Sequence, residues 1–400
     1  MLPPLRIRFR PRNRHMPSAI LTLVMIFIFG AQIARAWSNG QPASLVLGQT
    51  DFTTNSDTGE PSATTTQDPN GVAVDPATGK VFVADSTNNC VLRFASIASL
   101  SNGVAAEAIL GQSDFTNRDY STITAAEMSG PTNVAVDSSG RLWVADTGNN
   151  RVLRFDKAAT KANGAPADGV FGQADFTHNG LGTTQSTFKE PSGLVVDSSG
   201  RLWVSDSGNL RVLRFDNAAA KSNGANADGV LGQPDFTSSV SVATQNGMGE
   251  PIGITVDSQG HLWVDDTVNS RVLRFDSAAT KTNGAAADGV LGKPDFTSTD
   301  NDTTQTGMVT PMGVAVDTTG TLWVADSNNN RVLRFDNAAT KANGTAADGV
   351  LGQADFTSNA GAMTRTGLNR PEGIAVDKNN NIWIADNANS RVLYFTNNTP

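Results

Sequence analysis

The amino-acid sequence predicts an all-β fold, a six-bladed β-propeller with four strands in each blade. Three observations lead to this fold class. Prolines recur every 60 residues, at positions 131, 191, 251, 311 and 371, and a further proline precedes them at position 69. Apolar segments follow each proline in the same order, so six units of about 60 residues fill almost all of the 400-residue chain. The 38 glycines, 17 prolines and only 17% charged residues disfavour a helical or coiled-coil protein.

Four short strands are predicted in each unit. In the second unit they are expected at residues 131–137, 142–146, 151–155 and 170–173. The segments are rich in Val, Leu, Ile, Trp and Phe and are bounded by Gly, Asn, Asp and Ser, which is typical of strands joined by tight turns. Such short apolar strands suit sheets that are covered on both faces. Packing the sheets radially and closing the ring buries the two faces that an open stack would expose.

The connection between the third and fourth strands also repeats. In the second unit it begins at Asp156 and ends at Asn163-Gly164. An aspartate at the start and Asn-Gly at the end could bracket one helical turn. We expect this connection on the face of the ring opposite the turns that precede the prolines.

The repeated segments carry a family resemblance. Residues 131–137 read PTNVAVD and residues 142–152 read LWVADTGNNRV, with counterparts in every unit. This pattern resembles the NHL repeat, and the resemblance extends from Pro69 to Phe395. It implies a six-bladed propeller. It says little about function, because one fold hosts many activities.

The units are cut one strand out of phase with the chain. The fourth-strand signature Leu-Gly-Gln-x-Asp-Phe occurs six times with small changes, and its first copy, at Leu47, precedes the first proline unit. The last unit stops after its third strand, at Phe395. We therefore predict that residues 44–52 supply the outer strand of the sixth blade, beside residues 392–395. This pairing would close the ring and remove two free sheet edges.

The first 36 residues have the features of a signal peptide. Five arginines precede an apolar run at residues 20–29, and Ala34-Arg35-Ala36 is a small-x-small cleavage pattern. The expected domains are a signal peptide at 1–36 and a propeller at 37–400. The protein is expected to be exported, to the periplasm, the cell surface or the medium. The apolar run is short for a spanning helix, which favours a cleaved signal. The alternative is an uncleaved membrane anchor with the arginines kept inside.

The net charge narrows the possible partners. The leader holds six arginines and no acid, which leaves 24 basic and 38 acidic residues, a net charge of −14. Such a surface repels nucleic acid, so no nucleic-acid partner is expected.

Cys90 is the only cysteine, so no intramolecular disulfide can form. We expect it to be a buried and unreactive thiol.

Several repeated side chains are predicted to have structural roles. A tryptophan recurs in the second strand and is expected to pack between blades: Trp143, Trp203, Trp263, Trp323 and Trp383, with Phe82 in the first unit. Asp146, Asn149 and Arg151 also recur, and a bidentate Arg–Asp pair is expected at this turn. The first unit has Cys90 in place of the arginine, which predicts a less tightly tied blade. Asp265 replaces Ala or Ser in the fourth unit. It is either buried with a raised pKa or solvated at a strand end, and we expect the latter.

Ligand-binding residues are expected where the units differ, near the prolines at the central axis. These non-repeating positions are Asp68/Asn70, Gly130/Asn133, Glu190/Ser192, Glu250/Ile252, Thr310/Met312 and Arg370/Glu372. Our candidates for ligand binding are Asn70, Asn133, Glu190, Glu250, Arg370 and Glu372. No catalytic residue is predicted, and neither a metal site nor a required cofactor is expected.

Three functions remain open, of which the third is a structural surface protein without a small-molecule ligand. The first is a binding or interaction scaffold for a protein, peptide or glycan, with membrane contact only if the leader is uncleaved. The second is a metal-dependent lactonase or hydrolase, because propellers similar to gluconolactonase use Glu, Asn and Asp around a divalent cation such as calcium. Asn133, Glu190, Glu250 and Glu372 match that chemistry in type. The propeller lyase acting on peptidyl-hydroxyglycine is disfavoured, because the chain lacks its histidine-rich metal site.

Overall fold

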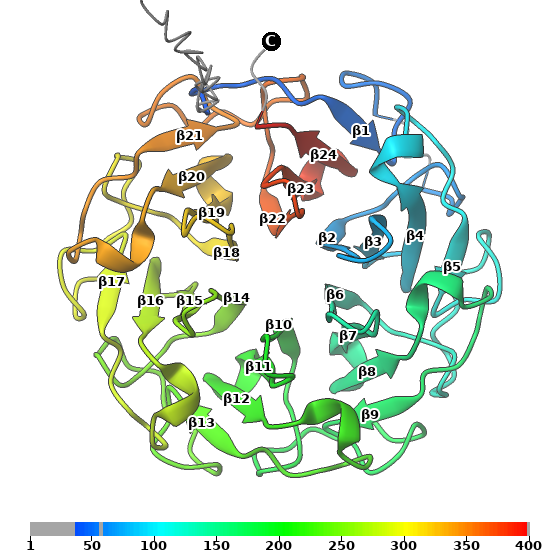
Figure 1. Ribbon diagram of the computed structural model, residues 1–400, viewed down its shortest axis with the longest axis horizontal. Helices are drawn as coiled ribbons and strands as arrows, with labels where there is room; N and C mark the ends of the chain where they lie inside the picture. Colours follow the sequence, from blue (N-terminus) through cyan, green and yellow to red (C-terminus); the bar gives the residue numbers. More distant parts are fainter. Residues whose placement is uncertain (1–36, 56–58, 398–400) are drawn as a thin grey trace, which may run out of the picture. The chain divides into compact units, whose positions relative to one another are not determined.

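The computed structural model describes residues 37–55 and 59–397. Within this part, six antiparallel four-stranded sheets are arranged radially around a central axis, as Figure 1 shows. The all-β six-bladed propeller is therefore confirmed. The predicted signal peptide lies outside the described residues. In the described part, no helix has both the length and the apolar character needed to cross a bilayer.

Each blade contributes one strand to each of four positions counted outward from the axis. The inner strands, which define blades 1 to 6, are β2 (Pro69–Val74), β6 (Pro131–Val136), β10 (Pro191–Val196), β14 (Pro251–Val256), β18 (Pro311–Val316) and β22 (Pro371–Val376). The second strands are β3 (Lys80–Asp85), β7 (Leu142–Asp146), β11 (Leu202–Asp206), β15 (Leu262–Asp266), β19 (Leu322–Asp326) and β23 (Ile382–Asp386). The third strands are β4 (Cys90–Ser96), β8 (Arg151–Phe155), β12 (Arg211–Phe215), β16 (Arg271–Phe275), β20 (Arg331–Phe335) and β24 (Arg391–Phe395).

The outer strands are short. They are β5 (Ala108–Leu110), β9 (Gly169–Phe171), β13 (Gly229–Leu231), β17 (Gly289–Leu291), β21 (Gly349–Leu351) and, for blade 6, β1 (Leu45–Leu47). Short 3₁₀ helices follow the third strands: η1 (Ile97–Ser99), η3 (Ala158–Thr160), η5 (Ala218–Ala220), η6 (Ala278–Thr280) and η8 (Ala338–Thr340). Others form the turn between the second and third strands: η2 (Thr147–Asn149), η4 (Ser207–Asn209), η7 (Ser327–Asn329) and η9 (Asn387–Asn389).

The connections between strands open on two opposite faces of the ring. We call the face where the inner strands begin the proline face. It also carries the turns between second and third strands and the long connections that lead from one blade to the next. The opposite face, called the hairpin face, carries the turns between first and second strands and the η3-type connections. The predicted helical turn at 156–164 is present as η3, with Lys157 rather than Asp156 preceding it.

The two ends of the described chain close the ring. β1 pairs antiparallel with β24, with Leu45 opposite Tyr394 and Leu47 opposite Val392. Figure 1 shows the blue strand β1 beside the red strand β24. The predicted closure of the sixth blade by the N-terminal strand is confirmed.

The core lies between neighbouring blades. The five repeated tryptophans are at most 2% exposed. Trp143 of blade 2, for example, packs in one cluster with Leu194 and Val204 of blade 3. Packing between blades, as predicted, is therefore the role of these side chains. Cys90 is also buried, and this burial raises the pKa of its thiol well above the usual range.

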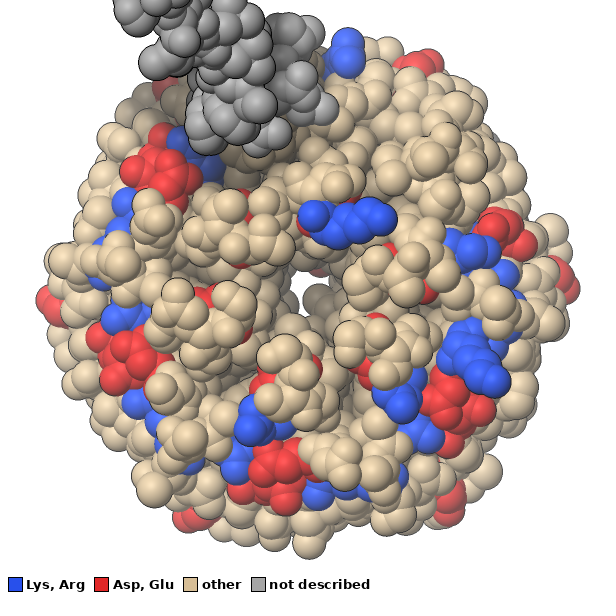
Figure 2. Space-filling model, viewed as in Figure 1, with Lys and Arg blue, Asp and Glu red and all other residues tan. Residues whose placement is uncertain are grey.

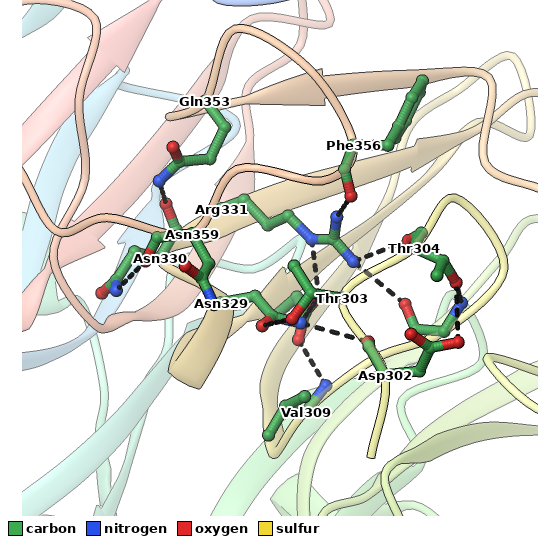
Figure 3. A network of polar contacts seen from close by, with 12 residues as sticks. Asp302, Thr303, Thr304, Val309, Asn329, Asn330, Arg331, Gln353, Phe356 and Asn359 are labelled. Carbon is green, nitrogen blue, oxygen red and sulfur yellow. Dashed lines mark hydrogen bonds and ion pairs between the residues drawn. The ribbon is translucent and has the colours of Figure 1, made fainter. Parts of the chain in front are cut away.

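A buried polar network ties each of blades 2 to 6 together, and Figure 3 shows it in blade 5. Arg331 Nε donates a 2.7 Å hydrogen bond to Asp326 Oδ2. Its Nη2 donates to the main-chain oxygen of Thr304 at 2.8 Å, and its Nη1 donates to that of Phe356. The expected bidentate Arg–Asp pair is therefore wrong, because the two outer nitrogens bind the backbone instead. Asn329 Nδ2 donates to Asp326 at 2.8 Å.

Blade 1 lacks this arginine. Cys90 occupies its position, and Asp85 accepts hydrogen bonds from Asn88 Nδ2 at 2.9 Å and from the amide of Gln67 at 2.9 Å. In blade 5, Arg331 binds the backbone of two loops. Cys90 cannot replace these bonds in blade 1, because its thiol packs among apolar side chains. That blade 1 is less tightly tied stays a prediction.

The environment of Asp265 differs from the one expected. Its exposed fraction is 0%, and neither carboxyl oxygen has a hydrogen-bond partner in the described structure. The expectation of a solvated strand end was wrong, because this position of β15 faces the interior between blades 4 and 5. A β-carbon added to Gly253 would lie 2.4 Å from Asp265 Oδ2. Burial raises the pKa of Asp265 well above its usual range, and neighbouring Asp266 adds to the rise.

Candidate functional site at the axial mouth

A cavity of about 320 Å³ lies at the axis on the proline face, and we call it the axial mouth. All six blades contribute to its wall: Asn70, Thr132, Asn133, Thr147, Glu190, Ser192, Ser207, Glu250, Ile252, Met312, Glu372 and Gly373. Five of the six candidate residues are thus brought together, while Arg370 is not part of the wall. A narrower channel of about 210 Å³ continues between the inner strands. Figure 2 shows an opening at the centre of the ring.

Residues with left-handed backbone surround the mouth. The residue before each proline has a positive φ: Asp68 (51°), Gly130 (52°), Glu190 (52°), Glu250 (25°), Thr310 (56°) and Arg370 (51°). This backbone conformation is unfavourable for residues other than glycine, so contacts with the surrounding structure must stabilise it. The preceding blade supplies the partner: Asn150 Oδ1 accepts from the Glu190 amide at 2.9 Å, and Asn330 Oδ1 accepts from the Arg370 amide at 2.7 Å.

Blade 4 departs from this arrangement. Leu210 stands where Asn150 and Asn330 stand in their turns, and its side chain cannot accept a hydrogen bond. The φ of Glu250 is 25°, about half the value found before the other prolines. The acidic side chain of Glu250 is exposed at the rim of the mouth.

The wall of the mouth has a polar arc and an apolar arc. The residues that follow the prolines form this ring: Asn70, Thr132, Ser192, Ile252, Met312 and Glu372. Blades 6, 1, 2 and 3 thus present a carboxyl, an amide and two hydroxyl groups, whereas blades 4 and 5 present two apolar side chains. An amphipathic ligand fits such a wall better than a purely polar or purely apolar one.

The inner strands approach one another closely at the second residue after each proline, which limits the side chains that fit there. Five blades have glycine there, and a β-carbon added to Gly313 would lie only 1.8 Å from the main-chain oxygen of Glu372. Blade 2 has Asn133 instead, and this side chain lines both the mouth and the channel. Asn133 is therefore the one side chain that this position of the six inner strands directs into the axial region.

Hydroxyl groups of the wall also form hydrogen bonds that tie neighbouring blades together. Thr147 Oγ1 donates to the main-chain oxygen of Pro191 at 2.6 Å and is bonded to Thr132 Oγ1 at 2.7 Å. In blade 6 the same position is Asn387, whose Nδ2 donates to Asn70 Oδ1 at 2.8 Å. Thr147 and its counterpart Ser207 were not predicted as site residues. A Ser or Thr directly after the aspartate that ends the second strand is the signal that marks them.

Glu372 is the most perturbed acid of the wall. Burial raises its pKa to about 7; the nearby Arg370 opposes this rise and the carboxylate of Asp68 adds to it. Within the described part of the chain, no hydrogen bond or ion pair holds its carboxyl group. An unengaged carboxyl at a cavity wall is available to a hydrogen-bond donor or a cation of a ligand.

The wall does not fit a metal centre. In residues 37–55 and 59–397, no group of three or more His, Cys, Asp or Glu side chains could hold a metal ion. His178 and His261 each bind a local aspartate, Asp175 and Asp257, outside the mouth. Asp300-Asn301-Asp302 resembles part of a calcium-binding loop, but there the ammonium group of Lys293 donates to the main-chain oxygen of Asp300.

Comparison with known proteins agrees with this architecture. Residues 66–94, 128–155, 188–215, 248–275, 309–335 and 368–395 each match the NHL repeat model. The ring is therefore a six-bladed β-propeller built from NHL repeats. A stretch of 148 residues is 30% identical to NHL repeat-containing protein 2 of Gallus gallus, covering 34% of this chain but only 19% of that protein.

Solved structures share the fold at low identity. A protein of unknown function from Bacteroides thetaiotaomicron matches with a TM-score of 0.54 and 15% identity, over 89% of this chain and 75% of that one. A gluconolactonase of Xanthomonas campestris matches with a TM-score of 0.46 and 16% identity, over 89% and 99% of the two chains. At these identities the similarity concerns the fold alone.

Proposed function

We propose that the protein is an exported NHL-repeat propeller that binds a ligand in the axial mouth and performs no catalysis. The observation that carries the proposal is the composition of the wall. Framework side chains repeat from blade to blade, whereas the residue that follows the proline, which lines the mouth, differs in all six blades. The ligand is amphipathic, since it must satisfy Glu372 and Asn70 on one side and contact Ile252 and Met312 on the other. Export is supported by the leader pattern in residues 1–36.

Thermal stability in the presence of ligand mixtures tests this function. A ligand that binds the folded ring raises its melting temperature. Peptide and glycan mixtures are screened against the full chain, and each positive is repeated with Asn133→Gly. Gly is the residue found at this position in the other five blades, so the variant is expected to fold. A shift that disappears in Asn133→Gly supports binding at the axis, whereas a shift of the same size in both proteins places the ligand elsewhere.

The second candidate is a metal-dependent lactonase or hydrolase. One observation favours it: a pKa near 7 at Glu372 would allow this carboxyl to give or take a proton at neutral pH. The donor set of a divalent cation is not assembled at the wall, so we derive no step through a metal. Titration with calcium separates the two functions. A large stabilisation that a chelator reverses, together with lactone hydrolysis, favours the enzyme; no response favours the binding protein.

A further inference from the structure

We infer that the proline face is the docking surface for an extended peptide segment of a protein partner that is both basic and apolar. A lysine or arginine side chain of the segment occupies the axial mouth, and apolar side chains of the segment lie over blade 4. This inference rests on the proposed function, because it uses the same mouth. It adds the class of ligand and a second contact area outside the cavity.

The second contact area is a group of exposed valines. Val240, Val242 and Val268 have exposed fractions of 63%, 42% and 58%, and we call them the blade 4 strip. Val268 lies in the turn between the second and third strands, and the other two lie in the connection that enters blade 4, so all three open on the proline face. Solvent-exposed apolar groups gathered in one place indicate an interaction site.

No other blade carries this strip. The equivalent positions in blade 6 are Ala360, Ala362 and Ala388. Those leading into blade 5 are Asp300, Asp302 and Asn328, and those of blade 3 are glycines. The turn and loop geometry therefore does not require valine at any of the three positions. Tyr120 and Leu181 are exposed singly in the connections that enter blades 2 and 3, so the group of three exposed valines is a feature of blade 4. It lies in the same sector as the apolar arc of the mouth.

The strip is continuous with the rim of the mouth. The amide of Thr267, next to Val268, donates a 3.3 Å hydrogen bond to the main-chain oxygen of Glu250. A β-carbon added to Gly249 would lie 3.0 Å from the Cβ of Val268, and one added to Gly247 would lie 2.2 Å from a methyl group of Val242. Val242 and Val268 thus lie beside the segment 247–250 that leads to the rim of the mouth.

Charge selects a basic partner for this face. The connections of the proline face, residues 48–68, 111–130, 172–190, 232–250, 292–310 and 352–370, hold far more acidic than basic side chains. The hairpin face is different, because its acids face arginines and lysines: Arg154 pairs with Asp156 at 3.1 Å and Lys161 with Asp168 at 2.9 Å. In Figure 2, acidic and basic side chains lie next to one another around the face turned to the viewer. Complementary charge on the partner steers it to the unpaired acids.

Fluorescence anisotropy with labelled synthetic peptides tests this surface. The probe is a heptapeptide with one lysine near its start and three valines at alternating positions. One comparison peptide has glutamate in place of lysine, and the other has serine in place of each valine. The lysine–valine peptide is expected to bind the full chain, and both comparison peptides at least about tenfold more weakly. Equal binding of all three peptides, or of none, overturns the inference.

Two variants locate the contacts. Val240→Ala, Val242→Ala and Val268→Ala together give blade 4 the residues of blade 6. They are expected to weaken binding of the lysine–valine peptide about tenfold while leaving the serine peptide unaffected, because only apolar contact is lost. Glu372→Gln is expected to weaken binding of both lysine peptides, because it removes the one carboxyl group that is buried in the wall, while Glu190 and Glu250 remain. Tyr120→Ala removes an exposed side chain of the same face away from the strip and is the matched control, with no change expected.

The outcomes separate this inference from the proposed function. Loss of binding in Glu372→Gln with no effect of the triple valine variant supports the mouth and overturns the strip. An effect of the triple variant with none of Glu372→Gln overturns the docking of the basic side chain in the mouth. Binding that neither variant changes overturns the docking surface as a whole, whereas binding that both weaken supports it.

Discussion

Arg334 Nη1 donates a 3.1 Å hydrogen bond to the main-chain oxygen of Trp37, across almost the whole described chain. The equivalent arginine of blade 2, Arg154, binds the main-chain oxygen of Ala219 in the next blade at 2.8 Å. In blades 1 to 4 the arginine's partner lies in the connection between the third and fourth strands of the next blade, the η3-type connection. In blade 6, Trp37 takes the place of that connection. The N-terminal segment completes blade 6 twice, through β1 and through this contact. The ring of Trp37 also lies edge-on to that of Trp323, with 4.7 Å between their centres.

Removal of residues 37–53 is expected to lower the melting temperature and to cause self-association. The deletion leaves the edge of β24 unpaired and uncovers Trp323, and an unpaired strand edge is a template for another chain. Differential scanning fluorimetry and size-exclusion chromatography of the truncated ring measure both effects. An unchanged melting temperature in a monodisperse monomer would contradict the closure described above.

Replacement of Arg331 by alanine is expected to destabilise the protein by about 3–5 kcal/mol, because Asp326 would remain buried without its cation. Burial already raises the pKa of Asp326, and Arg331 opposes this rise. Arg141→Ala is the control, since Arg141 pairs with Asp137 at 3.3 Å while one third of its side chain is exposed. Such surface pairs contribute about 0–1 kcal/mol. Urea unfolding compares the variants, and similar losses for both would argue against the network as the main tie.

Asp265→Ala is expected to stabilise the ring, and more so as the pH rises. Burial raises the folded-state pKa of this carboxyl, so the folded protein holds a proton that the unfolded chain has released. Wild-type stability therefore falls as pH rises from about 4 toward the folded pKa, by about 1.4 kcal/mol for each pH unit in that window. Melting temperatures at pH 5 and pH 8 for both proteins measure this, with the exposed Asp300→Ala as control. A gain that does not grow with pH would count against a protonated, unpaired carboxyl.

Affinity for the lysine–valine peptide is expected to rise between pH 6 and pH 8. Glu372 has a raised pKa of about 7, so it gains its negative charge in this interval while the peptide's lysine stays protonated. The affinity should level off above the pKa, and Glu372→Gln should show a flat profile. Anisotropy titrations at four pH values are sufficient. A profile that rises equally in the variant would assign the dependence to another group.

The fold could be predicted because six copies of one pattern report the same structure. The phase of those copies, with Leu47 before the first unit and Phe395 ending the last, was enough to predict the closure. Asp265 was misjudged because a charged residue near a strand end is commonly exposed. Four of the five equivalent residues are alanine, however, and this small apolar residue indicates a tight buried position.

The site could be predicted only in part. Selecting positions that differ between blades found Asn70, Asn133 and the three glutamates of the wall. The same criterion discards Thr147 and Ser207, because a hydroxyl group repeats at their position even though it lines the cavity. Arg370 also differs between blades but lies outside the wall, although Glu190 and Glu250 hold the same position in blades 3 and 4 and line it. The alternation of polar and apolar arcs depends on the order of the blades around the axis, which no single unit contains.

The pairing of β1 with β24 also fixes the order in which the protein can be completed. Among the described strands, β1 is synthesised first and β24 last, so β1 waits until all the others have been made. Contacts between residues this distant in sequence form slowly, because a long loop must close first. We therefore expect the pairing of β1 with β24 to be a late step of folding, and a chain that ends before β24 leaves β1 without its partner strand. The ring can therefore close only after all six repeats have been synthesised.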